Sequence, residues 1–149
     1  MIKKYIVLIC LIFFLTNCGF SPIYVKNTNT NFSIENVNYQ GDRELNNFLK
    51  TNLNQYKNEN SDRKILIEAT SEYKKTILTK NTASEVTNYK LIANVTFVIK
   101  PTNKKINITE EKIISSMDDK FEEARKERAT KQNFARSISN KLISELVIN

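Results

Sequence analysis

Cys18 is the residue whose chemistry the sequence specifies most closely, because its thiol stands directly behind an apolar segment. Lys3 and Lys4 precede that segment, which runs from Tyr5 to Leu15 with hardly a polar side chain, and this layout is that of a secretory signal peptide. A membrane-spanning helix needs roughly 20 apolar residues, and this run reaches only about half that length. We therefore expect residues 1–17 to be a signal peptide that is cleaved before Cys18.

The residues ahead of the cysteine are Leu15-Thr16-Asn17, and a leucine three positions before a cysteine at the cleavage point is typical of a bacterial lipobox. The Cys18 thiol would then carry a thioether-linked lipid, and the new amino terminus an acyl chain such as palmitate. The alternatives are a signal peptide cut elsewhere or an uncleaved anchor, with a plain thiol at Cys18. Because Cys10 is discarded with the signal, Cys18 is the one cysteine that remains. An unpaired cysteine is unusual in an exported protein, and lipid attachment would explain it.

The composition argues against catalysis. The chain has no histidine, which is the usual general base at neutral pH, and it keeps no free thiol once Cys18 is modified. Its two glycines, Gly19 and Gly41, are too few for a glycine-rich phosphate loop. We expect no enzyme, no cofactor and no metal site. The remaining catalytic alternative is a hydrolase in which carboxylates such as Glu110 and Glu111 converge.

Positive charge is concentrated in one part of the sequence. The whole chain has 23 Lys and Arg against 16 Asp and Glu, and after loss of the signal peptide all of the excess lies within residues 73–112. Lysines beside the apolar Ile92 and Val98 suit an anionic amphiphile, whose phosphates meet ammonium groups while its acyl chains meet hydrocarbon. The candidate binding residues are Lys74, Lys75, Lys80 and Lys90. The alternatives are an edge strand that lysines protect from pairing, or codon bias.

The first half of the exported chain predicts a tether, a strand and a helix. Residues 18–31 are mostly polar without helical period and predict a lipidated tether, and residues 32–39 predict a short strand with a shift in phase. Asp42 predicts the N-cap of a helix. Its apolar stripe consists of Leu45, Phe48, Leu49, Leu53 and Tyr56. We expect this stripe to face the core and a loop over residues 58–62 to follow it.

The second half predicts a three-stranded meander and a long helix. Residues 65–69, 89–99 and 106–114 alternate with period two and are expected to pair antiparallel. A helix is expected from about Asp119 to Val147, with Ser116 and Asp119 at capping-box spacing. Its apolar stripe consists of Phe121, Ala124, Ala135, Ile138, Leu142 and Leu146, with Phe134 at the edge. The many charges of its first half predict a solvated surface.

These elements predict an α+β domain over residues 32–149, with two helices packed on one face of a mainly antiparallel four-stranded sheet. The order of features resembles that of the LPS-assembly lipoprotein LptE family, in its alphaproteobacterial form. The resemblance spans most of the exported chain. It depends on the start Cys18-Gly19-Phe20-Ser21-Pro22-Ile23-Tyr24, on Gly41-Asp42-Arg43-Glu44-Leu45 before the first helix, on the Tyr89-to-Ile99 strand and on the long terminal helix.

The resemblance implies an outer-membrane lipoprotein that assists assembly of the β-barrel LptD, plugs it, and binds lipopolysaccharide on its way to the cell surface. The chain would be anchored to the outer membrane by the lipid and would face the periplasm or the barrel lumen. Its partners would be the barrel and lipopolysaccharide, and no nucleic acid is expected. A second hypothesis, from a different class, is a lipid-anchored periplasmic scaffold or auxiliary lipoprotein without a ligand.

Overall fold

The computed structural model describes residues 32–58, 61 and 63–148 of the 149-residue chain. The elements run in the order β1 (Ser33–Gly41), α2 (Arg43–Leu53), the 3-10 helix η2 (Asn54–Tyr56), β2 (Lys64–Lys80), β3 (Val86–Lys100), β4 (Lys104–Ser115) and α3 (Lys120–Ile148). The expected signal peptide, tether and lipidated Cys18 lie outside the described residues. Within the described ranges, neither helix has the length and hydropathy needed to cross a bilayer.

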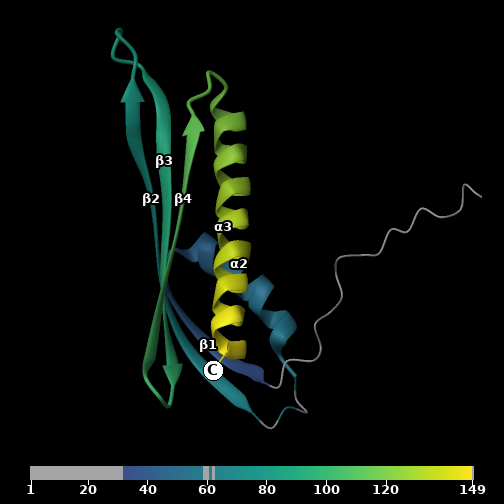
Figure 1. Cartoon of the computed structure of the whole chain (residues 1–149). Helices are drawn as coiled ribbons and strands as arrows, with labels where there is room; N and C mark the ends of the chain where they lie inside the picture. Colours follow the sequence, from purple (N-terminus) through teal and green to yellow (C-terminus); the bar gives the residue numbers. More distant parts are fainter. Residues whose placement is uncertain (1–31, 59–60, 62, 149) are drawn as a thin grey trace, which may run out of the picture.

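The four strands form one mixed sheet in the order β1-β2-β3-β4 (Figure 1). The expected antiparallel meander is confirmed for β2, β3 and β4. β1, by contrast, pairs parallel with β2, because α2 and the following loop carry the chain back to the end of the sheet where β1 began. The predicted α+β class, with four strands and two helices, is therefore confirmed, and the sheet is mixed.

A single buried cluster joins the helices to alternate residues of the strands. In β2 and β3 the buried positions are odd-numbered, from Ile65 to Ala69 and from Leu91 to Ile99, whereas their even-numbered neighbours are half-buried or exposed. The odd-numbered residues define the α3 face of these strands, since Tyr73 and Lys75 bond to α3 side chains there. The even-numbered residues define the outer face.

The expected phase shift in β1 is a β-bulge. The pairing with β2 shifts between Ile34 and Asn36, which inserts one residue into the alternation. As a result Val37 and Tyr39 pack against the same core as the fully buried Ile34. With strict alternation, Val37 and Tyr39 would lie on the face opposite to Ile34.

Gly41 and Asp42 connect β1 to α2 through a close backbone approach. Gly41 has φ +97°, and a Cβ atom built on it would lie 1.8 Å from the carbonyl oxygen of Ser71. The predicted N-cap is confirmed, because Asp42 Oδ1 accepts the backbone N–H of Leu45 at 2.7 Å. Only glycine fits at position 41, where the chain turns from sheet to helix.

α3 is continuous over 29 residues, and Asp119 caps its start by accepting the backbone N–H groups of Phe121 and Glu122. Its second half supplies the expected core residues, including Ala135, Ile138 and Leu142 at 0 % exposure. In its first half most charged side chains are exposed, as expected, but the assignment of Phe121 and Ala124 to the core stripe was wrong. Phe121 is 75 % exposed and Ala124 is exposed, while Glu123 is buried against the sheet.

β2 and β3 extend well past the short strands predicted from the alternation. β1 pairs with β2 only as far as Ser71. Beyond that point β2 pairs with β3 alone, and we call residues 72–94 the projecting hairpin. Figure 1 shows this hairpin reaching beyond the beginning of α3. It carries all four lysines that the sequence singled out.

Candidate functional site

The projecting hairpin separates the four candidate lysines by face. Lys74 and Lys90 both lie on the outer face, where Lys74 is opposite Ile92 and Lys90 is opposite Thr76, so the two lysines are diagonal neighbours. Lys80 is the last residue of β2 and is exposed. Lys75 lies on the α3 face. The structure therefore brings Lys74 and Lys90 together and points Lys75 away from them.

The outer-face lysines are held in ion pairs, exposed at Lys74 and half-buried at Lys90. Lys74 Nζ lies 2.7 Å from Glu72 Oε1, and Lys90 Nζ lies 2.6 Å from Glu111 Oε2. The hydrogen bond from Lys74 lowers the pKa of Glu72, and desolvation acts in the opposite direction. Solvent screens ion pairs of this kind, so an incoming anion can compete with the carboxylates for these lysines.

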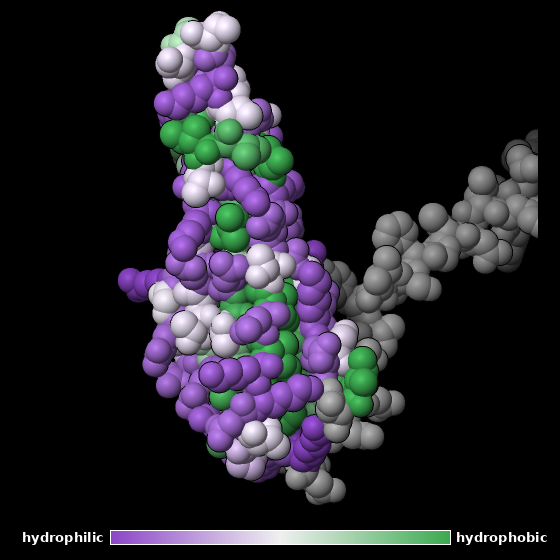
Figure 2. Space-filling model, turned by 60° about the vertical axis from the view of Figure 1, so that its left-hand side comes forward, coloured by the Kyte–Doolittle hydropathy of each residue, from purple (hydrophilic) through white to green (hydrophobic). Residues whose placement is uncertain are grey.

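Large apolar side chains accompany these lysines. Ile113, the β4 residue opposite Lys90 on the outer face, is 57 % exposed. Leu78 is 45 % exposed, and Ile77, which shares the α3 face with Lys75, is 55 % exposed. Figure 2 shows apolar atoms gathered on the narrow projecting part of the molecule, between hydrophilic zones. This surface combines ammonium groups with hydrocarbon, which is what an anionic amphiphile requires.

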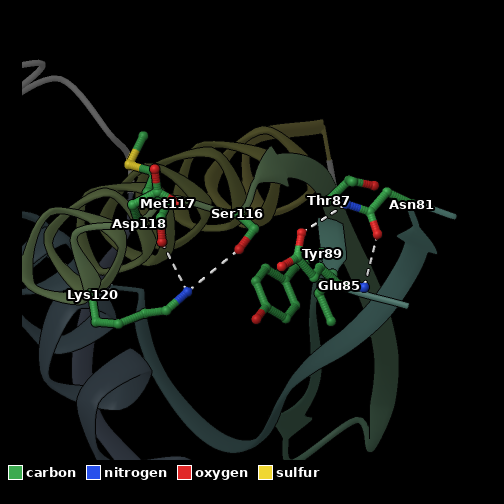
Figure 3. A pocket seen from close by; sticks show the side chains of 9 residues that line it. Asn81, Glu85, Thr87, Tyr89, Ser116, Met117, Asp118 and Lys120 are labelled. Carbon is green, nitrogen blue, oxygen red and sulfur yellow. Dashed lines mark hydrogen bonds between the residues drawn. The ribbon is translucent and has the colours of Figure 1, made fainter. Parts of the chain in front are cut away.

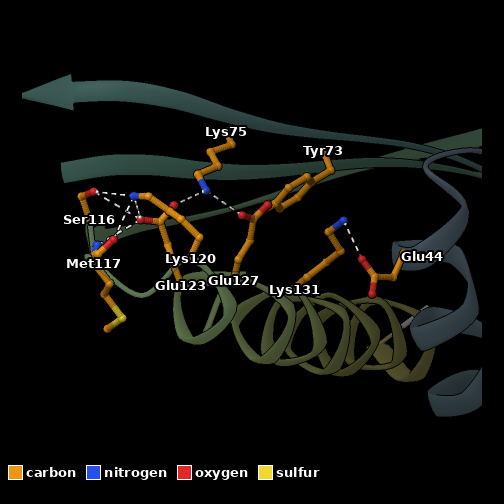
Figure 4. A network of polar contacts seen from close by, with 9 residues as sticks. All are labelled: Glu44, Tyr73, Lys75, Ser116, Met117, Lys120, Glu123, Glu127 and Lys131. Atoms are coloured by element: carbon orange, nitrogen blue, oxygen red, sulfur yellow. Dashed lines mark hydrogen bonds and ion pairs between the residues drawn. The ribbon is translucent and has the colours of Figure 1, made fainter. Parts of the chain in front are cut away.

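On the α3 face, charged side chains fill the space between the projecting hairpin and the first half of α3 (Figure 4). Lys75 Nζ lies 3.0 Å from Glu123 Oε1 and 2.9 Å from Glu127 Oε2. It also lies 4.2 Å from the centre of the Tyr89 ring, and the Tyr73 hydroxyl donates to Glu127 Oε1 at 3.0 Å. Burial opposes the charge on Lys75, but the hydrogen bonds to Glu127 and Glu123 outweigh it and raise the pKa of Lys75.

Glu123 is the most buried carboxylate in this group, with 5 % of its surface exposed. Its Oε2 accepts the backbone N–H of Met117 at 3.0 Å and side-chain hydrogen bonds from Ser116 and Lys120, both at 3.2 Å. The backbone hydrogen bond from Met117, followed by that from Lys75, lowers the pKa of Glu123 to about 2. Glu123 therefore binds both the β4–α3 connection, through Met117, and the hairpin, through Lys75, to the first turns of α3.

Lys131 lies at the end of this group of charged side chains that is nearest to α2. Its Nζ lies 3.0 Å from Glu44 Oε2 and 3.7 Å from Asp42 Oδ2, and it sits 4.0 Å from the centre of the Tyr73 ring. Its side chain is only 9 % exposed. Beside this network, burial is the main cause that raises the pKa of Tyr73 far above its ordinary value. We call the six residues Glu44, Tyr73, Lys75, Glu123, Glu127 and Lys131 the ionic layer.

The sequence reasoning missed the ionic layer, because it assigned the charges in the first half of α3 to a solvated surface and Lys75 to lipopolysaccharide binding. A signal was present in the spacing. Glu123, Glu127 and Lys131 recur every four residues and so share one face of α3. Tyr73 and Lys75 recur every two residues, in phase with the buried positions of β2.

An open hollow of about 620 Å³ lies between residues 81–89 of the hairpin and the β4–α3 connection (Figure 3). Lys120 Nζ donates to the carbonyl oxygen of Met117 at 2.8 Å and contacts Ser116 Oγ at 3.4 Å. Across the hollow, Asn81 Nδ2 donates to Glu85 Oε2 at 2.8 Å. Lys120 and Asn81 thus already bond to their neighbours.

The two carboxylates considered for hydrolysis do not converge. Glu110 lies on the α3 face, 2.7 Å from both Ser137 Oγ and Lys141 Nζ, whereas Glu111 pairs with Lys90 on the outer face. Burial opposes the charge on Glu110, but the bonds from Lys141 and Ser137 lower the pKa of Glu110 overall. Among the described residues, no three carboxylate, thiol or imidazole groups are arranged to hold a metal ion.

Several solved lipoprotein structures share this fold. The crystal structure of the rare lipoprotein B from Shewanella oneidensis matches with a TM-score of 0.56 and 13% identity, over 74% of this chain and 92% of that one. The solution structure of the uncharacterized lipoprotein B from Nitrosomonas europaea gives 0.54 and 12%, over 78% and 85%. A minor lipoprotein from Acinetobacter baumannii gives 0.51 and 14%, over 74% and 94%.

At these identities the likeness concerns the fold, which agrees with the fold expected from the sequence resemblance. No protein-family model and no curated protein sequence matches the chain. The alphaproteobacterial type therefore stays a prediction from the sequence motifs.

Proposed function

We propose that this chain is an outer-membrane lipoprotein that binds lipopolysaccharide through the outer face of its projecting hairpin. The observation that carries this proposal is the combination of Lys74 and Lys90 with the exposed Ile113 on the outer face. Lys80 and Leu78 are also exposed toward the tip of the hairpin, which projects beyond the beginning of α3. Phosphates of the lipid would replace carboxylates at the lysines, and acyl chains would contact the apolar side chains.

We further propose that Cys18 carries the lipid that holds the chain at the membrane. Two independent features support an anchor: the lipobox pattern that ends in Cys18, and the fold shared with three lipoproteins. The resemblance to the LptE family directs the anchored chain to the outer membrane, facing the periplasm or a barrel lumen. Mass spectrometry of the membrane-extracted chain tests the anchor, since an unmodified thiol at Cys18 would contradict it.

The proposed partner is the β-barrel LptD, which the chain would plug and help to assemble. Barrel lumens are polar, and a plug must present polar groups to them. The outer face of the sheet supports this role, because it mixes lysines and glutamates with threonine and asparagine side chains. In this account the chain acts by binding and not by catalysis.

A second candidate function is a lipid-anchored periplasmic scaffold without a ligand. It is favoured by the ion pairs that Lys74, Lys75 and Lys90 already make within the chain. Co-purification separates the two. A tagged chain extracted in mild detergent should bring down a large β-barrel and should bind purified lipopolysaccharide with an affinity that falls as salt rises. A free monomer without affinity for lipopolysaccharide would support the scaffold.

A further inference from the structure

Among the described residues, the β2 strand has an unpaired edge along the projecting hairpin. β1 pairs with β2 from Lys64 to Ser71, and the last backbone bond on that side is donated by Asp42 N–H to the Ser71 carbonyl at 3.2 Å. In the described part of the chain no strand lies beside β2 after Ser71, and Figure 1 shows β1 next to the other half of β2 only. A strand edge of this kind is a template for another extended segment.

The backbone groups that face this edge can be identified from the register. The Ser71 carbonyl points toward the β1 side, and the N–H and C=O groups of one strand residue point to the same side. The pairing with β3 is uninterrupted from Ser71 to Ile77, so the backbone groups of Tyr73, Lys75 and Ile77 point outward. Irregular pairing between Ile77 and Thr79 ends the flat stretch. The edge thus offers three N–H and three C=O groups between two defined limits.

The charge of this segment indicates what kind of strand it would accept. Between Glu72 and Lys80, three lysines against one glutamate leave a net charge of +2. Lys75 is occupied by Glu123 and Glu127. Lys74, 56 % exposed on the outer face, pairs with the exposed Glu72, and Lys80 is exposed. Opposite charges on neighbouring strands stabilise pairing and like charges weaken it, so a second copy of this edge is disfavoured.

We propose that the β2 edge from Tyr73 to Ile77 binds an extended, acidic segment of a partner protein by strand addition. The partner's backbone would bond to Tyr73, Lys75 and Ile77, and its acidic side chains would face Lys74 and Lys80. This goes beyond the proposed function, because it concerns backbone pairing with a protein and does not depend on lipopolysaccharide.

Amide hydrogen exchange on the full chain tests the proposal, with a synthetic octapeptide of alternating valine and glutamate as the probe. The amides of Tyr73, Lys75 and Ile77 should exchange about tenfold more slowly with this peptide. The amides of Lys74 and Thr76, which face β3, should not change. The same peptide with lysine for glutamate should have no effect.

Proline at Ile77 supplies the matched variant, because it removes one outward N–H at an edge position where proline is tolerated. Ile77→Pro should weaken peptide binding about tenfold, whereas Ile77→Ala, which keeps the N–H, should bind within about twofold of the unsubstituted chain. If Ile77→Pro fails to fold, the exchange data on the unsubstituted chain still decide the question.

The proposal is overturned if the acidic peptide at millimolar concentration leaves these three amides unprotected, or if the lysine peptide protects them equally. Protection that rises with protein concentration alone would assign the edge to a second copy. Protection by anionic phospholipid vesicles, and not by the acidic peptide, would assign it to a lipid surface.

Discussion

Lys75 and Glu123, 48 residues apart in the sequence, form an ion pair of 3.0 Å between β2 and the first turns of α3. Their side chains are 26 % and 6 % exposed. This contact joins the projecting hairpin to the helix through charge, whereas the second half of α3 is joined to the sheet through hydrocarbon. The domain therefore has an apolar core at one end and the ionic layer at the other.

Removal of Lys75 should destabilise the domain, because it leaves Glu123 and Glu127 without their shared cation. Breaking a fully buried pair costs about 3–5 kcal/mol, and the partial exposure of Lys75 reduces this to an expected 1–3 kcal/mol for Lys75→Met. Urea denaturation measures the change. Lys74→Met, one residue away on the outer face, should change stability by less than about 0.5 kcal/mol. Equal effects of the two substitutions would contradict the ionic layer.

Stability should fall in acid through Glu123. A carboxyl whose pKa is depressed in the folded state stabilises fully above its ordinary pKa of 4.5, and this contribution is lost as the pH falls toward about 2. Urea midpoints measured between pH 6 and pH 2.5 should fall less steeply for Glu123→Gln than for the unsubstituted chain. Glu122→Gln, whose side chain is 49 % exposed, is the control and should keep the full slope. Identical slopes for all three proteins would rule out this role for Glu123.

Gly41→Ala should destabilise the junction between β1 and α2. The new Cβ would lie 1.8 Å from the Ser71 carbonyl oxygen, at a φ of +97° that side chains rarely adopt. We expect a loss of more than about 1 kcal/mol in the free energy of unfolding. Thermal or urea denaturation measures it against Gln40→Ala, an exposed neighbouring position that should be nearly neutral. A neutral Gly41→Ala would mean that the strand approaches Ser71 less closely.

Leu142→Ala tests the helix phase. Leu142 is 0 % exposed in the main cluster, and large-to-small substitutions at such positions cost about 2–5 kcal/mol. Ser144→Ala, at an exposed position on the same helix, should cost less than about 0.5 kcal/mol. If the two variants unfold at the same urea concentration, the second half of α3 does not face the core as described.

The sequence predicted those parts of the fold that are held together by hydrocarbon. Ile138, Leu142 and Leu146 recur at helical spacing, and apolar residues occupy the odd-numbered positions of β3. Each pattern distinguishes a face that packs in the core from a face that contacts solvent. Asp42 was predictable as an N-cap because its carboxylate has a local role that depends on the next few residues.

Hydropathy patterns do not predict the contacts of the ionic layer. The second half of β2 has no apolar alternation, because Lys75 on its α3 face meets carboxylates instead of hydrocarbon. For the same reason Phe121 was assigned to the core and Glu123 to solvent, and the structure reverses both. A hydropathy pattern separates water from hydrocarbon, but it does not show that two sets of charged side chains face each other.

The central claim is that the outer face of the projecting hairpin binds an anionic amphiphile, and charge reversal tests it most directly. The double variant Lys74→Glu/Lys80→Glu leaves the ionic layer intact. It is matched in charge by Lys57→Glu/Lys126→Glu, at exposed positions outside the hairpin. Titration with purified lipopolysaccharide should give a Kd raised about tenfold or more, with a weaker salt dependence, for the hairpin variant only. The same Kd for both double variants would contradict the account.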